Sequence, residues 1–113
     1  MTILLPGEAA RTRGALDKGA TTYDVLREAD LVVVAVPPDA VVDAALLAAG
    51  SLRPGTVLTD VASTKVAIVS ALEQRLPRLI RYVGGHPMAG AERSGPQAAD
   101  AALLAGRPFV ITP

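Results

Sequence analysis

Cysteine is absent from this chain of 113 residues, and histidine and aromatic side chains are scarce, with one His, two Tyr, one Phe and no Trp. A chain without cysteine forms no disulfide, no thiolate zinc site and no cysteine nucleophile, and one histidine offers few ligands for a zinc centre. We therefore expect no bound metal. An excess of charge of one sign is also lacking, because eleven basic residues balance eleven acidic ones. Since nucleic-acid-binding modules are usually basic, we expect no nucleic-acid partner.

Long apolar segments are missing too. The apolar run Leu31–Val36 is far shorter than the run of about 20 residues that a membrane-spanning helix needs. Met1–Pro6 has neither the basic start nor the extended apolar region of a signal peptide. We expect a soluble cytoplasmic protein without membrane contact. At about 100–150 residues per domain, residues 1–113 are expected to form one domain.

Several nucleotide-binding and hydrolytic motifs are absent. No two glycines have G-x-G spacing, so there is no dinucleotide fingerprint, and neither a Walker A loop nor a G-x-S-x-G elbow occurs. A triad of Ser63, His86 and Asp60 can be drawn, but no local feature marks Ser63 as a strained nucleophile. The sequence therefore gives no support for a hydrolase.

Apolar patterns predict short strands alternating with helices. The predicted strands are Ile3–Leu5, Leu31–Val36, Thr56–Val61, Ile80–Val83 and Pro108–Thr112. The predicted helices are Glu8–Lys18, stopped by Gly19, a turn over Tyr23–Ala29, then Asp39–Ala49, Lys65–Leu76 and Gln97–Leu104. The run Leu31–Val36 has no polar alternation, which is typical of a strand covered on both faces. This order predicts a layered α/β domain with a mostly parallel sheet and flanking helices.

Ligands of such sheets bind beyond the carboxyl ends of the strands. Three stretches are predicted to lie there: "VPPD", "DVASTK" and "GGHPMAG". In the first, Pro37 and Pro38 stop a strand and leave its end open for a flat ligand, although a plain strand terminator has the same sequence. We therefore expect the three stretches to form one site.

His86 is the one side chain whose ordinary pKa, about 6.5, lies near neutral pH. A lone histidine is more often a structural hydrogen-bonding group than a catalyst. Its setting favours the second role, because Gly84 and Gly85 permit unusual backbone conformations and close approach of a ligand, and Pro87 fixes the chain after the imidazole. A general base has to be held in this way.

The stretch "DVASTK" places Asp60 at a strand end, and Ser63 or Thr64 in position to cap the next helix. A helix N-terminus also suits an anion. Lys65 in the first turn is unfavourable for the helix dipole, which indicates a negatively charged ligand, but a solvated lysine explains it equally well.

The segments "DLVVVAVPP", "TDVASTK" and "VGGHPMAGAERSGPQAA…LLAGRPFVITP", taken together, resemble the nucleotide-binding domain of prephenate dehydrogenases and the related arogenate and cyclohexadienyl dehydrogenases. The resemblance extends from about Asp30 to Pro113. It implies the C-terminal half of a Rossmann-like NAD(P)-binding domain. It also implies oxidation of prephenate or arogenate by NAD or NADP with loss of CO₂, which yields 4-hydroxyphenylpyruvate or tyrosine in tyrosine biosynthesis.

Matching residue by residue, His86 corresponds to the family's catalytic histidine, which accepts the proton of the ring hydroxyl. Ser63 corresponds to a serine near that histidine and the nicotinamide, so it is expected to serve both catalysis and cofactor binding. Val36 and Pro37 correspond to the strand end that lies against the cofactor.

Two further positions are expected at the substrate entrance. Glu92 corresponds to an acidic residue there, and Lys65 occupies a basic position of the family without a defined role. The sequence does not decide between prephenate and arogenate as substrate, or between NAD and NADP as cofactor.

The family pattern is incomplete. The glycine-rich first βα unit and the helical C-terminal domain, which forms most of the family's dimer interface, have no counterpart, so residues 1–113 are expected to be a truncated domain. The leading interpretation is a fragment of a dehydrogenase that alone turns over slowly or not at all. The alternatives are a non-catalytic remnant, a nucleotide-binding module, or a chain that self-associates through its exposed strand edges.

Overall fold

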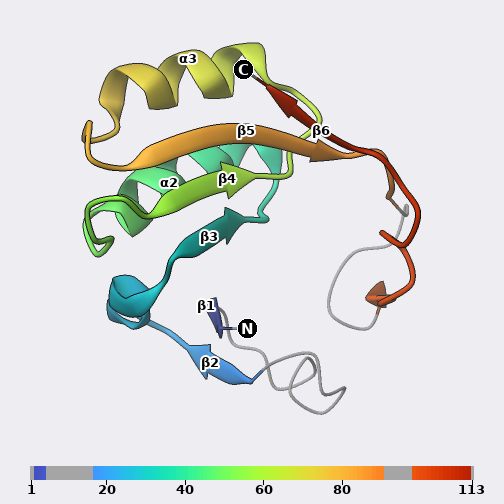
Figure 1. The fold of residues 1–113 in the computed structure, drawn as a ribbon, viewed down its shortest axis with the longest axis horizontal. Coiled ribbons are helices and arrows are strands. Elements are labelled where there is room, and N and C mark those ends of the chain that lie inside the picture. Colours follow the sequence, from blue (N-terminus) through green and yellow to red (C-terminus); the bar gives the residue numbers. More distant parts are fainter. Residues whose placement is uncertain (1, 5–16, 91–97, 113) are drawn as a thin grey trace.

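The computed structural model describes residues 2–4, 17–90 and 98–112. Six strands form two sheets (Figure 1). In the smaller sheet, β1 (Thr2–Leu4) runs parallel to β2 (Lys18–Ala20). The larger sheet has the order β3 (Leu31–Val34), β4 (Val57–Asp60), β5 (Arg81–Pro87) and β6 (Phe109–Thr112). The first three of these strands are parallel, and β6 is antiparallel to β5. The predicted α/β fold with a mostly parallel sheet is confirmed.

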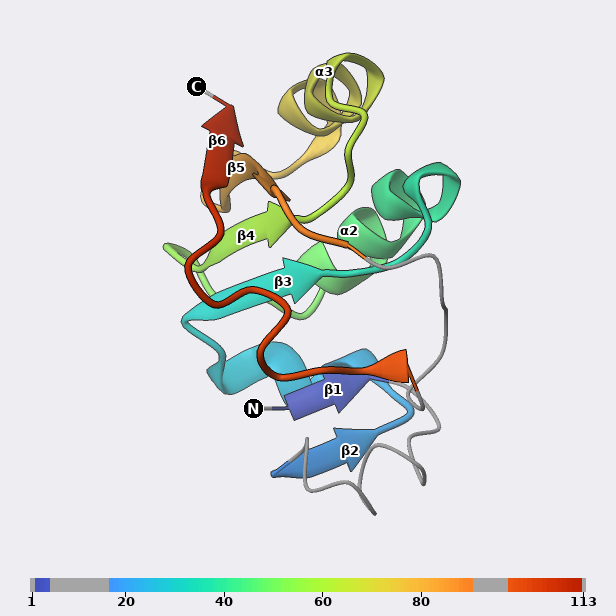
Figure 2. The same ribbon diagram turned by 90° about the vertical axis from the view of Figure 1, so that its right-hand side faces the viewer.

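Within the described residues, four helical segments connect the strands. They are the 3-10 helices η1 (Tyr23–Glu28) and η2 (Pro38–Ala40) and the α-helices α2 (Val41–Ala49) and α3 (Val66–Arg75). Both α-helices lie on one face of the larger sheet (Figure 2). None of the helices in the described part of the chain is long and apolar enough to cross a membrane.

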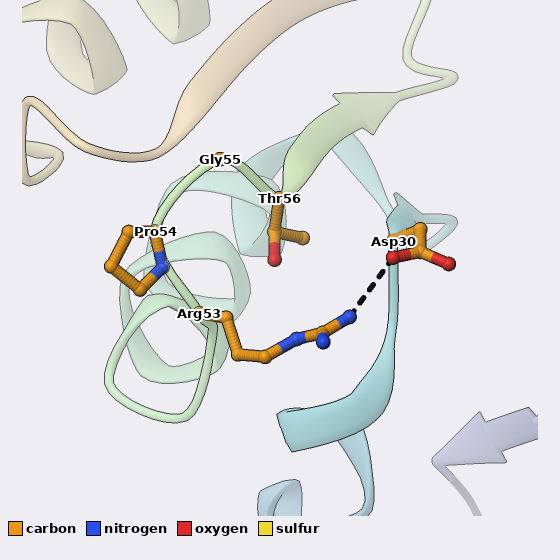
Figure 3. A pocket seen from close by; sticks show the side chains of 5 residues that line it. All are labelled: Asp30, Arg53, Pro54, Gly55 and Thr56. Atoms are coloured by element: carbon orange, nitrogen blue, oxygen red, sulfur yellow. Dashed lines mark hydrogen bonds and ion pairs between the residues drawn. The ribbon is translucent and has the colours of Figure 1, made fainter.

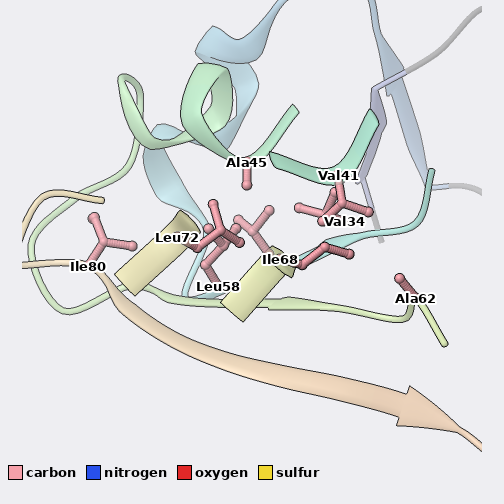
Figure 4. Close-up of a cluster of buried hydrophobic side chains, with 9 residues drawn as sticks. Val34, Val41, Ala45, Leu58, Ala62, Ile68, Leu72 and Ile80 are labelled. Atoms are coloured by element: carbon pink, nitrogen blue, oxygen red, sulfur yellow. The ribbon is translucent and has the colours of Figure 1, made fainter. Parts of the chain in front are cut away.

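The hydrophobic core lies between that face and the two α-helices (Figure 4). The register pairs Val32 with Leu58 and Leu58 with Tyr82, so these side chains share the helix-covered face. From the helices, Val41, Ala45, Ile68 and Leu72 complete the buried cluster together with Val34, Ala62 and Ile80. Leu58 and Leu72 have no exposed surface, and full burial of one such side chain stabilises a fold by about 1.5–3 kcal/mol.

The opposite face of the larger sheet is open in the described part of the chain, which corrects the expectation for β3. The side chains of β3 alternate between buried and exposed. Val32 and Val34 are buried, whereas Leu31 is 58% and Val33 is 51% exposed. The apolar run is therefore covered on one face only, because α2 and α3 both lie on the other.

Two predicted helices need correction. In place of the predicted helix Gln97–Leu104, residues 101–106 form turns, because bonds such as Leu103 N–H to the Asp100 carbonyl span three residues and the Asp100 side chain accepts the Ala102 amide. Gln97 lies outside the described residues. Leu104 is 57% exposed, so no apolar side is buried there to stabilise a helix. Of the predicted helix Glu8–Lys18, residues 8–16 lie outside the described residues, and Lys18 and Gly19 belong to β2.

Candidate active site

The carboxyl end of β4 carries a buried carboxylate that ties three segments together. Asp60 has no exposed surface. Its Oδ1 accepts hydrogen bonds from the Tyr82 hydroxyl at 2.9 Å and from the Gly85 amide at 3.3 Å. Its Oδ2 accepts the Ala62 amide at 3.0 Å and forms an ion pair with Lys65 Nζ. We call Asp60 and these four partners the Asp60 cluster.

The contacts within the Asp60 cluster shift the pKa values of Asp60 and Tyr82. Burial alone raises the pKa of Asp60, because it disfavours the charged form. The hydrogen bonds from Lys65 and Tyr82, the Ala62 amide and the charge of Lys65 together outweigh burial, so this pKa lies below its ordinary value. Burial, the hydrogen bond to Asp60 and the negative charges of Asp60 and Glu73 raise the pKa of Tyr82. The cluster therefore holds a carboxylate, an ammonium and a neutral phenol at neutral pH.

Lys65 is the ammonium partner of a buried acid. Its side chain is only 16% exposed, and its Nζ bonds to Asp60. It is the N-cap residue of α3, so an internal carboxylate compensates for its unfavourable place at the helix start. That contact explains Lys65 without an external anion. Its expected role at the substrate entrance stays a prediction.

Ser63 and Thr64 are exposed, and neither caps α3. The helix begins after Lys65 and has no side-chain cap hydrogen bond, so the capping expectation is wrong. The physical reason is that Asp60 takes the Ala62 amide and the Lys65 ammonium, which fixes the turn before α3 in another way. The Ser63 hydroxyl is left at the surface beside an uncapped helix N-terminus.

His86 lies inside β5 rather than in a loop beyond it. The strand runs from Arg81 to Pro87, four residues past the predicted end at Val83, and His86 pairs with Val110 of β6. The antiparallel β6 extends the strand, since it pairs with Gly84 through Pro87 and a further bond joins the Met88 amide to the Pro108 carbonyl at 2.8 Å. The imidazole is half-buried and makes no hydrogen bond to another described residue.

The direction of the imidazole follows from strand alternation. Successive side chains of a strand point to opposite faces. Tyr82 contacts the core, and a Cβ on Gly84 would lie 3.2 Å from Val69 of α3. His86 therefore shares the α3 face, beyond the end of β4, and Ser63 precedes α3 at the same end.

The two glycines before His86 are needed for close packing within the protein. Among the described glycines only Gly55 and Gly106 have positive φ, so the expected unusual backbone at Gly84 and Gly85 is not found. A Cβ on Gly85 would lie 2.6 Å from the Phe109 ring and 2.8 Å from the Asp60 carbonyl oxygen. Atoms of the chain occupy the space that the sequence analysis left for a ligand.

The remaining predicted site residues fall into two groups. Val36 is half-buried and Pro37 is exposed just after β3, at the same edge of the sheet as Ser63 and His86. Glu92 lies outside the described residues. The structure thus brings four of the predicted residues, and Lys65, to one edge.

Sequence reasoning missed Tyr82. Tyr82 was predicted only as part of an apolar strand, and Asp60 only as a strand end and as the third member of an unsupported triad with Ser63 and His86. The only signal in the sequence is strand alternation, which puts Asp60 on the same face as Leu58. That Leu58 lies beside Tyr82 is known only from the register of the assembled sheet.

An open hollow of about 260 Å³ lies at the opposite end of the sheet (Figure 3). Its lining includes Asp30 and Arg53, joined by an ion pair of 2.9 Å between exposed side chains, and Thr56 at the start of β4. Arg53 also donates to the Glu28 carbonyl at 3.2 Å. The hollow lies before the start of β4 and the Asp60 cluster lies at its end, so the hollow is separate from the candidate site.

Comparison with known proteins adds independent observations. The family model described as "Prephenate dehydrogenase, nucleotide-binding domain" matches residues 6–113. The cyclohexadienyl dehydrogenase of Zymomonas mobilis is 39% identical over 90 residues, which are 80% of this chain and 30% of that protein. The prephenate dehydrogenase of Lactococcus lactis is 34% identical over 105 residues, 91% of this chain and 30% of that protein.

Solved structures agree. Prephenate dehydrogenase from Aquifex aeolicus in complex with hydroxyphenyl propionate and NAD+ has a TM-score of 0.84 and 29% identity, and the match covers 99% of this chain and 40% of that one. Synechocystis arogenate dehydrogenase has a TM-score of 0.85 and 29% identity, covering 94% of this chain and 37% of that one. The match spans about 30% of the length of the Zymomonas mobilis and Lactococcus lactis proteins.

Proposed function

Because the chain belongs to the prephenate dehydrogenase family, within its nucleotide-binding domain, we propose that its residues serve an NAD(P)-dependent oxidation of prephenate. The reaction releases CO₂ and yields 4-hydroxyphenylpyruvate, as a step of tyrosine biosynthesis in the cytoplasm. Residues 1–113 would form part of one Rossmann-like domain of such an enzyme. Arogenate is the competing substrate, and the assay below includes it.

One observation carries the proposal. The two oxygens of a single buried carboxylate hold the two segments that bear Ser63 and His86 at the carboxyl edge of the sheet. This edge is where ligands of open α/β sheets bind. Ser63, which is exposed, and His86, whose imidazole has no hydrogen-bond partner in the described chain, both lie toward this edge.

The proposed roles follow from the chemistry of these groups. His86 would accept the proton of the ring hydroxyl as general base, since its imidazole is not engaged by another described residue. Ser63 would donate a hydrogen bond to the bound reactants. Lys65 would keep Asp60 charged and so hold both segments, while Glu92 would lie at the entrance.

The described residues fit a nicotinamide cofactor. Half-buried Val36 and exposed Pro37 offer an apolar strand end for a flat ring, and the uncapped start of α3 offers polar groups beside Ser63. Bound NAD or NADP would supply the hydride acceptor. The chain has no G-x-G turn for the pyrophosphate, so we propose weak cofactor binding and slow or no turnover by these 113 residues alone.

A chimera tests the activity. The 105 residues of this chain that match the Lactococcus lactis prephenate dehydrogenase would replace the corresponding 30% of that protein, and the rest of it is kept. We expect NAD(P)H formation at 340 nm with prephenate or arogenate, and a fall in kcat of about 10²–10⁴-fold for His86→Ala. A folded chimera that binds cofactor but whose turnover is unchanged by His86→Ala would contradict the proposal.

A self-associating module without turnover is the second candidate, favoured by the open sheet face with exposed Leu31 and Val33 on β3, the edge strand of the larger sheet in the described chain. Sedimentation velocity tests it. A concentration-dependent dimer that Val33→Lys disrupts would support it, and a monomer at high concentration would exclude it.

A further inference from the structure

The backbone ladder between β4 and β5 ends before the strand reaches His86. The parallel register runs from Val57 and Arg81 to Thr59 and Val83. From Gly84 onward β5 pairs only with β6 in the described chain. The link from β4 to this part of β5 is made instead by Asp60 Oδ1, which accepts the Gly85 amide, one residue before His86, and the Tyr82 hydroxyl.

The other oxygen of the same carboxylate holds the segment of Ser63. Oδ2 accepts the Ala62 amide and pairs with Lys65, and Ser63 lies between these two residues. A displacement of Asp60 would therefore release both the turn before α3 and the His86 end of β5.

Stability alone does not require a charge at this place. Asp60 is the only charged side chain buried in the described chain, and replacing a buried ion pair by apolar residues is often neutral or stabilising. What an apolar residue does not provide is directed bonding to separate segments. The arrangement is thus suited to fixing the geometry of groups on both sides of the carboxylate.

We propose that Asp60 is a positioning residue, and that its two oxygens set the placement of Ser63 relative to His86, with Tyr82 orienting the carboxylate. The proposal rests on the function proposed above, because this placement matters only if both residues act on the same ligand. Asp60 itself touches no reactant in this account.

The test uses the single histidine and the two tyrosines of the chain. In isotope-labelled protein, the imidazole signal of His86 and the amide signals of Ser63 and Gly85 are followed by NMR. Tyr82→Phe removes one bond to Asp60, and Tyr23→Phe in η1 is the matched control. We expect Tyr82→Phe, still folded, to shift all three signals and to speed exchange of the Gly85 amide by about tenfold, as for loss of one bond to a charged group. Tyr23→Phe should leave them unchanged.

A role in global stability alone would lower the unfolding temperature and leave the native signals in place. If Tyr82→Phe does that, the proposal is wrong. Asp60→Asn gives a second measurement, because the asparagine side chain has one acceptor oxygen where the carboxylate has two. In this variant the signals of Ser63 and His86 should both shift. The readout needs no cofactor, so it is independent of the proposed function: shifted signals without NAD(P) binding would leave Asp60 holding the two segments and refute the function only.

Discussion

The buried carboxylate of Asp60 accepts a hydrogen bond of 2.9 Å from the hydroxyl of Tyr82, 22 residues further along the chain. This contact joins the end of β4 to β5 on the helix-covered face of the sheet. The exposed ion pair between Asp30 and Arg53 has the same length but lies at the other end of β4. Asp60, which also pairs with Lys65, and Asp30 therefore allow a direct comparison of a buried and an exposed carboxylate.

Asp60→Ala is expected to lower the free energy of unfolding by about 3–5 kcal/mol, because it leaves the ammonium of Lys65 without its partner in a poorly solvated place. Asp30→Ala, which breaks the exposed pair, should cost less than about 1 kcal/mol. Urea unfolding followed by circular dichroism measures both, since the chain has no tryptophan. Equal losses from the two variants would show that burial of Asp60 has no energetic consequence.

Acid should destabilise the protein through Asp60. Its pKa in the folded chain lies below the ordinary value, so its contribution to stability is present above about pH 4 and is lost as the pH falls through the folded pKa. Urea midpoints between pH 7 and pH 2 should fall more steeply for the natural sequence than for Asp60→Asn. Parallel curves would contradict the ion pair.

Alkali should act through Tyr82. Burial and the charge of Asp60 raise its pKa, so the stability that its neutral form contributes is present below about pH 10 and is lost as the pH rises toward the folded pKa. In Tyr23→Phe protein, Tyr82 is the only phenol, and its absorbance at 295 nm reports ionisation. We expect ionisation only above pH 10, together with unfolding. Titration at or below pH 10 in folded protein would refute the buried hydroxyl.

Alanine substitution of three glycines should give a graded loss of stability. Gly85→Ala places a Cβ 2.8 Å from the Asp60 carbonyl oxygen, which is backbone and cannot yield easily, and 2.6 Å from the Phe109 ring. Overpacking of this kind costs about 1–3 kcal/mol. Gly84→Ala meets side-chain atoms at 3.2–3.3 Å and should cost less, and Gly90→Ala meets nothing within 4 Å. Thermal unfolding that ranks Gly90→Ala as the most harmful would overturn the packing described for β5.

Local sequence patterns were sufficient to predict β3 and β4, because each is an apolar segment bounded by turn residues. They also predicted the helical turn that begins at Tyr23. They did not predict that β5 continues through Gly84, Gly85 and His86, because glycine and proline are normally rare within strands. That extension depends on β6, whose residues lie more than 20 positions further along the sequence than their partners in β5. A pairing partner so distant leaves no local signal.

Only part of the candidate site could be predicted from the sequence. That Val36, Pro37, Ser63 and His86 lie toward one edge of the sheet follows from the order of the parallel strands. The Asp60 cluster does not, because the bond between Asp60 and Tyr82 depends on strand register and on burial. Register is a property of the assembled sheet, which no single segment determines.

We propose that the carboxyl edge of β3, β4 and β5 binds a nicotinamide cofactor. The most direct measurement is a titration of the folded chain with NAD and with NADP, observing the imidazole signal of His86, the one histidine, together with heat of binding. We predict saturable binding in the high micromolar to millimolar range, on the order of −4 to −6 kcal/mol. It should shift the His86 signal and be weakened by Ser63→Ala. If the chain is folded and neither cofactor moves that signal or releases heat, this edge does not bind the cofactor.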